Sequence, residues 1–195
     1  MKVAVAAVVG GLIVFVWSAI AHMATPLGTA GLSTLPGEDA VVAALRASGA
    51  GSGLYFIPGG DENPQLTPEQ QMARHMEKLQ AGPVGLLAYT AGPGEAMSPR
   101  QLLSELATSI LAAGVAAFLV SMMVGSLGQR AIAVSLLALF ATFSVTASYW
   151  IWYGFPTPFI GAGLVTEAIG WLLAGFAIAK IVPPPAAPAR ATAAV

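Results

Sequence analysis

The sequence VAVAAVVGGLIVFVWSAIAHM occupies residues 3–23 and contains no lysine, arginine or acidic residue. A helix of this length, at about 1.5 Å per residue, crosses the roughly 30 Å hydrocarbon core of a bilayer. Ala19-Ile20-Ala21 also fits a signal-peptide cleavage site, but the run is longer than the about 7–15 apolar residues of a secretory signal. We therefore predict that residues 1–23 form a retained signal-anchor transmembrane helix.

Three further apolar segments follow, at about residues 99–124, 131–153 and 159–182. Ser98-Pro99-Arg100-Gln101 has the composition of a helix start, because it supplies an N-cap serine, a proline at the first helical position and a glutamine at the third. Pro183-Pro184-Pro185 ends the last segment, since proline cannot continue a helix. The predicted fold class is a membrane all-α protein: a four-transmembrane-helix bundle, with helices 2–4 in residues 99–182 and a mobile Ala/Pro cytoplasmic tail in residues 183–195.

The composition agrees with residence in lipid. Hydrophobic residues make up 56% of the chain and charged residues 9%, against about 25% charged in a typical soluble domain. The absence of cysteine excludes disulfides and cysteine-ligated metal centres. The net charge of −1 gives no reason to expect a nucleic-acid partner.

Residues 24–98 have a different pattern, with most of the acidic residues and frequent glycine and proline. A helix is predicted after Pro36-Gly37, and Thr67-Pro68-Glu69-Gln70 is a capping-box start for a second one. Residues 53–58 and 84–90 are predicted strands, since they are apolar runs bounded by glycine and proline. We therefore predict a small αβαβ extracytoplasmic cap between transmembrane helices 1 and 2.

The basic residues predict the orientation of the chain. If the amino terminus is cytoplasmic, the cytoplasmic pieces carry only basic charges, at Lys2, Arg130, Lys180 and Arg190. This is the distribution that the positive-inside rule describes. Both termini are then cytoplasmic, and residues 24–98 are periplasmic or extracellular.

Glu105 and Glu167 are the only acidic residues inside the apolar segments, and His22 lies near the end of the first segment. A charge within the bilayer costs a few kcal/mol, so such groups are paired, protonated or functional. We predict that the three form a polar cluster, and three interpretations of it remain open. The cluster ties helices to each other or to the cap, or it lines a path for protons or a small solute, or it binds a metal such as zinc or iron. No Glu-x-x-His motif supports the metal, and the structural role is favoured.

The third and fourth apolar segments, with the residues between them, contain two further sets of residues with a predicted role. Gly163, Gly170 and Ala174 share the helical face of Glu167 and predict close helix packing there. An interfacial aromatic belt is predicted at the end of the third segment, comprising Tyr149, Trp150, Trp152, Tyr153 and Phe155. The predicted topology places Glu105 and Glu167 in the outer half of the bundle, beside this belt and at its junction with the cap.

Four pieces of the chain, in this order, resemble a family of bacterial four-helix inner-membrane proteins that has no assigned activity: Trp17–Met23, Gly37–Val41, Gly53–Gly59 and Trp152–Pro156. The resemblance covers most of the chain. It implies the topology and a bacterial inner-membrane location, and it carries no activity to this sequence.

No nucleophile with a base and an orienting group occurs at a motif spacing. We therefore expect a non-catalytic accessory or scaffolding subunit of a larger membrane complex, whose partners are membrane lipid and other integral membrane subunits, and we expect no cofactor. The alternative is a small transporter-like or ligand- or metal-binding membrane protein with an outward-facing pocket floored by Glu105 and Glu167.

Overall fold

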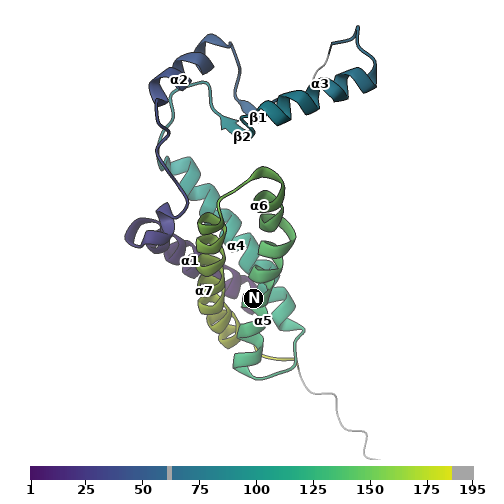
Figure 1. Ribbon diagram of the computed structural model, residues 1–195. Helices are drawn as coiled ribbons and strands as arrows, with labels where there is room; N and C mark the ends of the chain where they lie inside the picture. Colours follow the sequence, from purple (N-terminus) through teal and green to yellow (C-terminus); the bar gives the residue numbers. More distant parts are fainter. Residues whose placement is uncertain (61–62, 186–195) are drawn as a thin grey trace, which may run out of the picture. The chain divides into compact units, whose positions relative to one another are not determined.

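The computed structural model describes residues 1–60 and 63–185 and divides the chain into two compact units. Unit 1 contains Met1–Leu32, Met97–Ile151 and the residues from Phe155 onward. Unit 2 contains Ser33–Ala96 together with Trp152–Gly154. Most of the described chain is helical (Figure 1). Most of the predicted tail, including Arg190, lies outside the described residues.

Unit 1 consists of long helices. They are α1 (Lys2–Ala24), α4 (Pro99–Ser121), α5 (Leu127–Ala141), which continues through the π-helical segment η2 (Thr142–Thr146) into α6 (Ala147–Tyr153), and α7 (Thr157–Ile181), with a short 3₁₀ turn, η1 (Pro26–Thr29). Within the described chain, four helices are long and apolar enough to cross a membrane when α5, η2 and α6 are counted as one. The predicted number of spanning helices is therefore confirmed at the level of length and composition.

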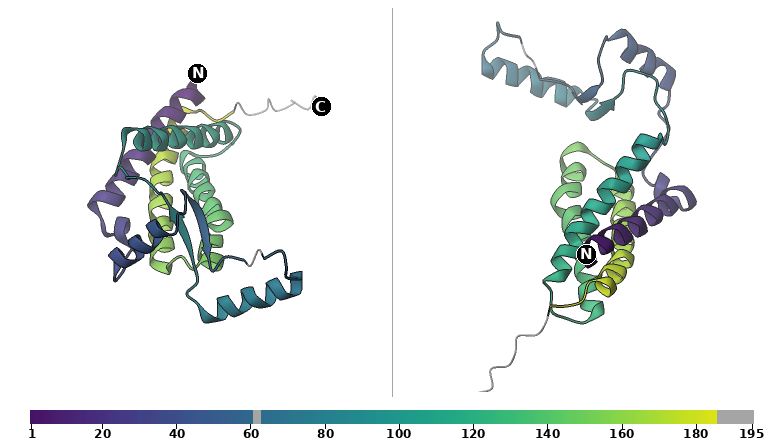
Figure 2. Two further views of the ribbon diagram at one scale, coloured as in Figure 1. Left: turned by 90° about the horizontal axis from the view of Figure 1, so that it is seen from above. Right: turned by 180° about the vertical axis from the view of Figure 1, so that it is seen from behind.

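Small residues allow the helices of unit 1 to approach one another closely. Helix α1 packs against α4 and α7, and α5 packs along α7 (Figures 1 and 2). A Cβ atom built on Gly11 would lie 2.6 Å from the Cα atom of Ile110, so only glycine fits at this contact. A Cβ on Gly10 would lie 2.8 Å from Cδ1 of Ile178. Helices in lipid gain little from the hydrophobic effect when they associate, so close van der Waals packing of this kind stabilises their contacts.

Helices α4 and α5 both begin with a capping box. The Ser98 hydroxyl accepts from the Gln101 amide, and the Gln101 side chain accepts from the Ser98 amide, as predicted. Ser126 and Gln129 form the same arrangement, which was not predicted. Helix α5 therefore begins at Leu127 instead of residue 131, and Arg130 lies in its first turn.

The third spanning helix also differs from the prediction in its middle. A continuous α-helix was expected, but η2 interrupts it. The Thr142 hydroxyl donates to the carbonyl oxygen of Ala138 at 3.0 Å, and the Ser144 hydroxyl donates to that of Phe140 at 2.7 Å. Hydroxyl groups that bond to the preceding turn compete with the backbone ladder and bend helices.

Unit 2 contains its elements in the predicted αβαβ order: α2 (Glu38–Ala47), β1 (Gly53–Ile57), α3 (Pro68–Ala81) and β2 (Gly85–Tyr89). The strands form a two-stranded antiparallel sheet in which Gly53 lies opposite Tyr89 and Ile57 opposite Gly85. The Thr67 capping box starts α3 as predicted. None of the described residues of unit 2 is buried, so its elements do not enclose a core.

Candidate functional site

Three helices of unit 1 surround an apolar hollow of about 430 Å³, called here the α4–α5–α7 groove. Its walls are Ala112, Val115 and Ala116 of α4, Leu137, Ala138 and Ala141 of α5, and Glu167 and Trp171 of α7. Glu167 is the only charged residue among these walls. The groove ends at Ala141, directly before η2, and single-turn π segments occur frequently at functional sites.

The carboxylate of Glu167 has one partner on its own helix. Trp171, one turn later, donates its indole N–H to Oε2 of Glu167 at 2.8 Å. Within the described chain, no lysine, arginine or histidine forms an ion pair with Glu167, and its side chain is exposed. A carboxyl group offers several acceptor positions, and Trp171 uses one of them.

The packing of α7 explains why Glu167 is exposed. The buried stripe of α7 recurs every four residues: Ala162, Thr166, Gly170, Ala174 and Ile178. Trp17 donates its indole N–H to the Thr166 carbonyl oxygen at 2.9 Å, and a Cβ on Gly170 would lie 2.7 Å from Trp17 Cδ1. Gly170 and Ala174 therefore lie at helix contacts.

Gly163 differs from Gly170 and Ala174, the other two residues of the predicted packing face. It is exposed, and a Cβ built on it would meet nothing within 4 Å. Glu167 lies one turn after Gly163, on the same exposed side of α7. The face of α7 that contacts other helices thus contains Thr166 in place of the predicted Glu167. The reason is that Trp17 packs over Gly170 and donates to the Thr166 carbonyl oxygen.

The structure does not bring the predicted polar cluster together. Glu105 is exposed and lines a separate, shallow hollow formed only by α4 residues: Arg100, Gln101, Ser104, Glu105 and Thr108. The nearest α4 residue of the groove, Ala112, follows Glu105 by about 10 Å along the helix axis. Glu105 and Glu167 thus line two separate hollows in the part of the chain that the structure describes.

His22 is also outside the groove. It is exposed, and its Nδ1 atom lies 3.0 Å from the Ser18 carbonyl oxygen in the same helix. Among the residues that the structure describes, no group of three histidine, aspartate or glutamate side chains is placed to hold a metal ion. The arrangement of His22, Glu105 and Glu167 gives no support to the metal-binding interpretation.

The predicted aromatic belt lies in α6, which contains four of its five residues, and in the turn before α7, which contains Phe155. The Tyr149 and Phe155 rings are 5.4 Å apart between centroids, and the Phe155 and Phe159 rings are 5.6 Å apart. Trp150 donates its indole N–H to the Thr157 hydroxyl at 3.2 Å. These contacts connect α6 to α7, while Trp152 and Tyr153 expose their side chains.

Arg130 has a role that the sequence did not reveal. Its side chain is only 2% exposed, and it donates to carbonyl oxygens at the ends of two helices: Val120 of α4, Ala179 of α7 and Val182, which directly follows α7. Helix carboxyl ends carry partial negative charge and lack intrahelical donors, so a guanidinium stabilises them. The capping box at Ser126 was the available signal, because it places Arg130 inside the first turn of α5.

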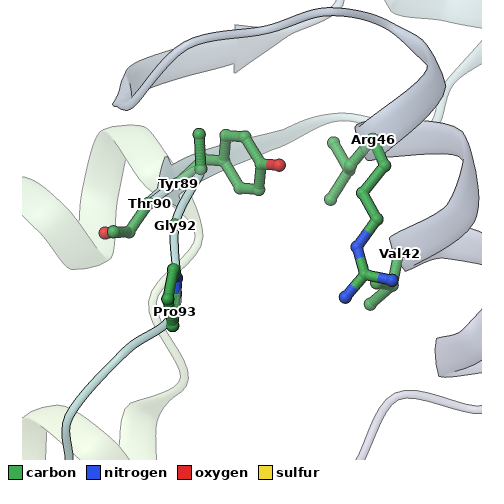
Figure 3. A pocket seen from close by; sticks show the side chains of 8 residues that line it. Val42, Arg46, Tyr89, Thr90, Gly92 and Pro93 are labelled. Atoms are coloured by element: carbon green, nitrogen blue, oxygen red, sulfur yellow. The ribbon is translucent and has the colours of Figure 1, made fainter.

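Unit 2 contains a second hollow, of about 470 Å³, called here the Arg46 pocket (Figure 3). One wall is Val42, Leu45 and Arg46 of α2, and the other is Tyr89 to Pro93, at the end of β2 and beyond it. Figure 3 shows the side chains of Arg46 and Tyr89 entering the hollow from opposite walls, whereas Thr90 points away. No sequence motif singled out these residues.

The chain matches no family model, and the comparisons with curated proteins and solved structures gave no match.

Proposed function

We propose that the chain is a non-catalytic integral membrane subunit that binds another membrane protein through the α4–α5–α7 groove. The observation that carries this proposal is the exposed carboxylate of Glu167 in an otherwise apolar groove. The four long apolar helices support residence in a membrane, and the small residues of the groove suit a docked helix.

The depth of Glu167 makes its exposure costly. Helix α7 has 25 residues and a length of about 37 Å, and Glu167 lies about 15 Å from its first residue. In a spanning helix this position is close to the middle of the bilayer, deeper than the predicted junction with the cap. A charged acid at that depth costs roughly 2.5–3.5 kcal/mol on insertion scales. A partner that donates hydrogen bonds to Glu167 offsets this cost.

The groove favours a helix as the occupant. Ala112, Ala116, Ala138 and Ala141 leave short side chains on two of its walls, and small residues permit close approach between helices. The partner helix would present a lysine, arginine or hydrogen-bonding side chain to Glu167. In its absence, membrane lipid fills the groove.

The proposed location is the bacterial inner membrane, with both termini cytoplasmic and residues 24–98 periplasmic or extracellular. Lys2, Lys180 and Arg190 support this orientation through the positive-inside rule. Arg130 contributes less than expected, because its guanidinium is buried against helix ends and does not face the headgroups.

The test is site-specific photo-crosslinking of a tagged chain in its native membrane. A crosslinker at Val115, on the groove wall, should capture a discrete membrane protein, whereas one at Phe118, exposed elsewhere on α4, should not. Glu167→Gln and Glu167→Leu should each reduce the captured partner by about tenfold. Glu105→Gln is the matched control, since it removes an exposed carboxylate outside the groove. Equal capture from Val115 and Phe118, or undiminished capture by both Glu167 variants, would reject the proposal.

A transporter-like or ligand-binding protein is the second candidate, because the groove volume lies in the range of about 300–1,000 Å³ typical of ligand pockets. In this version the site contains Glu167 and Trp171 without Glu105. The chain has no native cysteine, so Ala141→Cys, at an exposed position on the groove wall, introduces one defined thiol. A water-filled pocket predicts rapid labelling of this thiol by a membrane-impermeant reagent, whereas a docked helix predicts protection that is lost in Glu167→Leu.

A further inference from the structure

We propose that the Arg46 pocket binds a small organic acid, with its carboxylate on Arg46 and its apolar body against the apolar side chains of both walls. The inference goes beyond the proposed function, since every residue of the pocket belongs to unit 2 and every residue of the groove belongs to unit 1.

The charge of the pocket selects an anion. Arg46 is the only charged residue that lines it, and a guanidinium stays protonated at any physiological pH. The nearest acids on the same helix, Glu38 and Asp39, lie at its other end, about 10–12 Å away along the axis. Among the described residues, Arg46 forms no ion pair and its guanidinium donates no hydrogen bond.

The end of α2 leaves that guanidinium available. Free carbonyl groups in the last turn of a helix attract cations, but here those of Ala44, Leu45 and Arg46 already have donors. The Ser48 amide donates to the Ala44 carbonyl oxygen at 2.9 Å, and the Ser48 hydroxyl donates to that of Leu45 at 2.6 Å. The Gly49 amide donates to the Arg46 carbonyl oxygen at 3.4 Å. Arg46 is therefore not needed as the C-terminal cap of its own helix.

The opposite wall is fixed by the sheet. The Ala91 amide donates to the Ser52 hydroxyl at 3.0 Å, which joins the segment after β2 to the residue before β1. This bond holds the Tyr89–Pro93 segment next to the sheet. The Tyr89 side chain enters the hollow (Figure 3), so its ring offers an apolar surface and its hydroxyl a donor for the same anion.

The chemistry of the walls favours a carboxylate over a phosphate. One guanidinium pairs with one carboxylate through two parallel N–H···O bonds. A phosphate carries more charge and more acceptor oxygens, and phosphate sites commonly add backbone amides at a helix amino terminus. This pocket has no helix amino terminus among its walls, and it has the apolar side chains Val42, Leu45 and Pro93 beside Arg46. An acid with a branched or aromatic body fits these walls.

The test is a binding titration of 4-phenylbutyrate to the full chain in lipid nanodiscs, by calorimetry and by ligand-observed nuclear magnetic resonance. The neutral analogue 4-phenylbutanamide, which has the same body, should bind at least tenfold more weakly. Arg46→Gln should weaken binding of the acid by about tenfold, and Tyr89→Phe by about two- to threefold. Arg74→Gln is the matched control, because it removes one arginine of unit 2 outside the pocket walls and should leave the affinity within twofold.

A charge reversal makes the test sharper. Arg46→Glu should lose the acid and bind 4-phenylbutylamine more tightly than the native chain does. The proposal is overturned if the acid does not bind, if the acid and the amide bind equally, or if Arg46→Gln retains the native affinity. Stronger binding of a phenylalanine-ended peptide with a free carboxylate than of 4-phenylbutyrate would also overturn it, in favour of a site for chain termini. None of these outcomes involves the groove, so the proposed function is tested separately.

Discussion

The two units of this chain are built on different principles. Unit 1 buries small side chains between long helices, with Ala6, Ala113, Ala117 and Ala174 fully inaccessible. Unit 2 has regular helices, a paired sheet and a capping box, yet none of its described residues is buried. Local signals are thus sufficient to specify helices and strands, while a core requires faces that match those of a neighbour. We expect the stability of the molecule to reside mainly in unit 1.

The largest effect is expected for Arg130→Ala. The substitution leaves the carbonyl groups of Ala179 and Val182 without their donor, while that of Val120 keeps the Met123 amide, and each buried unsatisfied group costs about 1–3 kcal/mol. Unfolding monitored by scanning fluorimetry in detergent should show a loss of about 3 kcal/mol or more. Arg100→Ala, at an exposed position, is the control. A small change in Arg130→Ala would show that the stability of unit 1 does not depend on this link.

The glycine contacts come next. Gly11→Ala places a Cβ 2.6 Å from the backbone of Ile110, so α1 and α4 must separate, at a cost of about 1–3 kcal/mol. Gly163→Ala adds the same methyl group where nothing lies within 4 Å, and alanine favours a helix by about 1 kcal/mol. The two variants should shift the thermal midpoint of the purified chain in opposite directions. If Gly163→Ala destabilises the chain, Gly163 lies at a helix contact, as the sequence predicted.

Trp17→Phe should have a smaller effect. It removes the indole hydrogen bond to the Thr166 carbonyl oxygen and keeps an aromatic ring over Gly170, so a loss of about 1 kcal/mol is expected. The measurement is denaturant unfolding in mixed micelles. The control is Trp152→Phe, whose side chain is exposed.

The smallest effect is expected in unit 2. Phe56→Ser on β1 removes a ring that is already exposed, and such substitutions usually change stability by no more than about 0.5 kcal/mol. Amides of β1 and β2 should exchange with solvent faster than those at the middle of α4 and α7, because regions with few buried contacts open at low free energy. Slow exchange in β1, or a large loss of stability in Phe56→Ser, would indicate that unit 2 is covered by a partner.

The candidate site contains residues that the sequence identifies and residues that it does not. Glu167 is identifiable from the sequence, because an acid inside an apolar segment is rare and costly. Its separation from Glu105 is not identifiable, because two residues about equally far from the start of their helices need not face the same neighbour. The groove residues Ala112, Ala138 and Ala141 carry no signal of their own in an alanine-rich chain.

The sequence by itself determined the features that depend on neighbours within a few residues or on total length. These are the four long apolar helices, the Ser98 and Thr67 caps and the order of elements in unit 2. Tertiary structure alone decided that Gly170 packs and Gly163 does not, that Arg130 is buried, and that Glu167 lines the groove. The physical reason is that a helix apolar on every side has no preferred inner face until another helix contacts it.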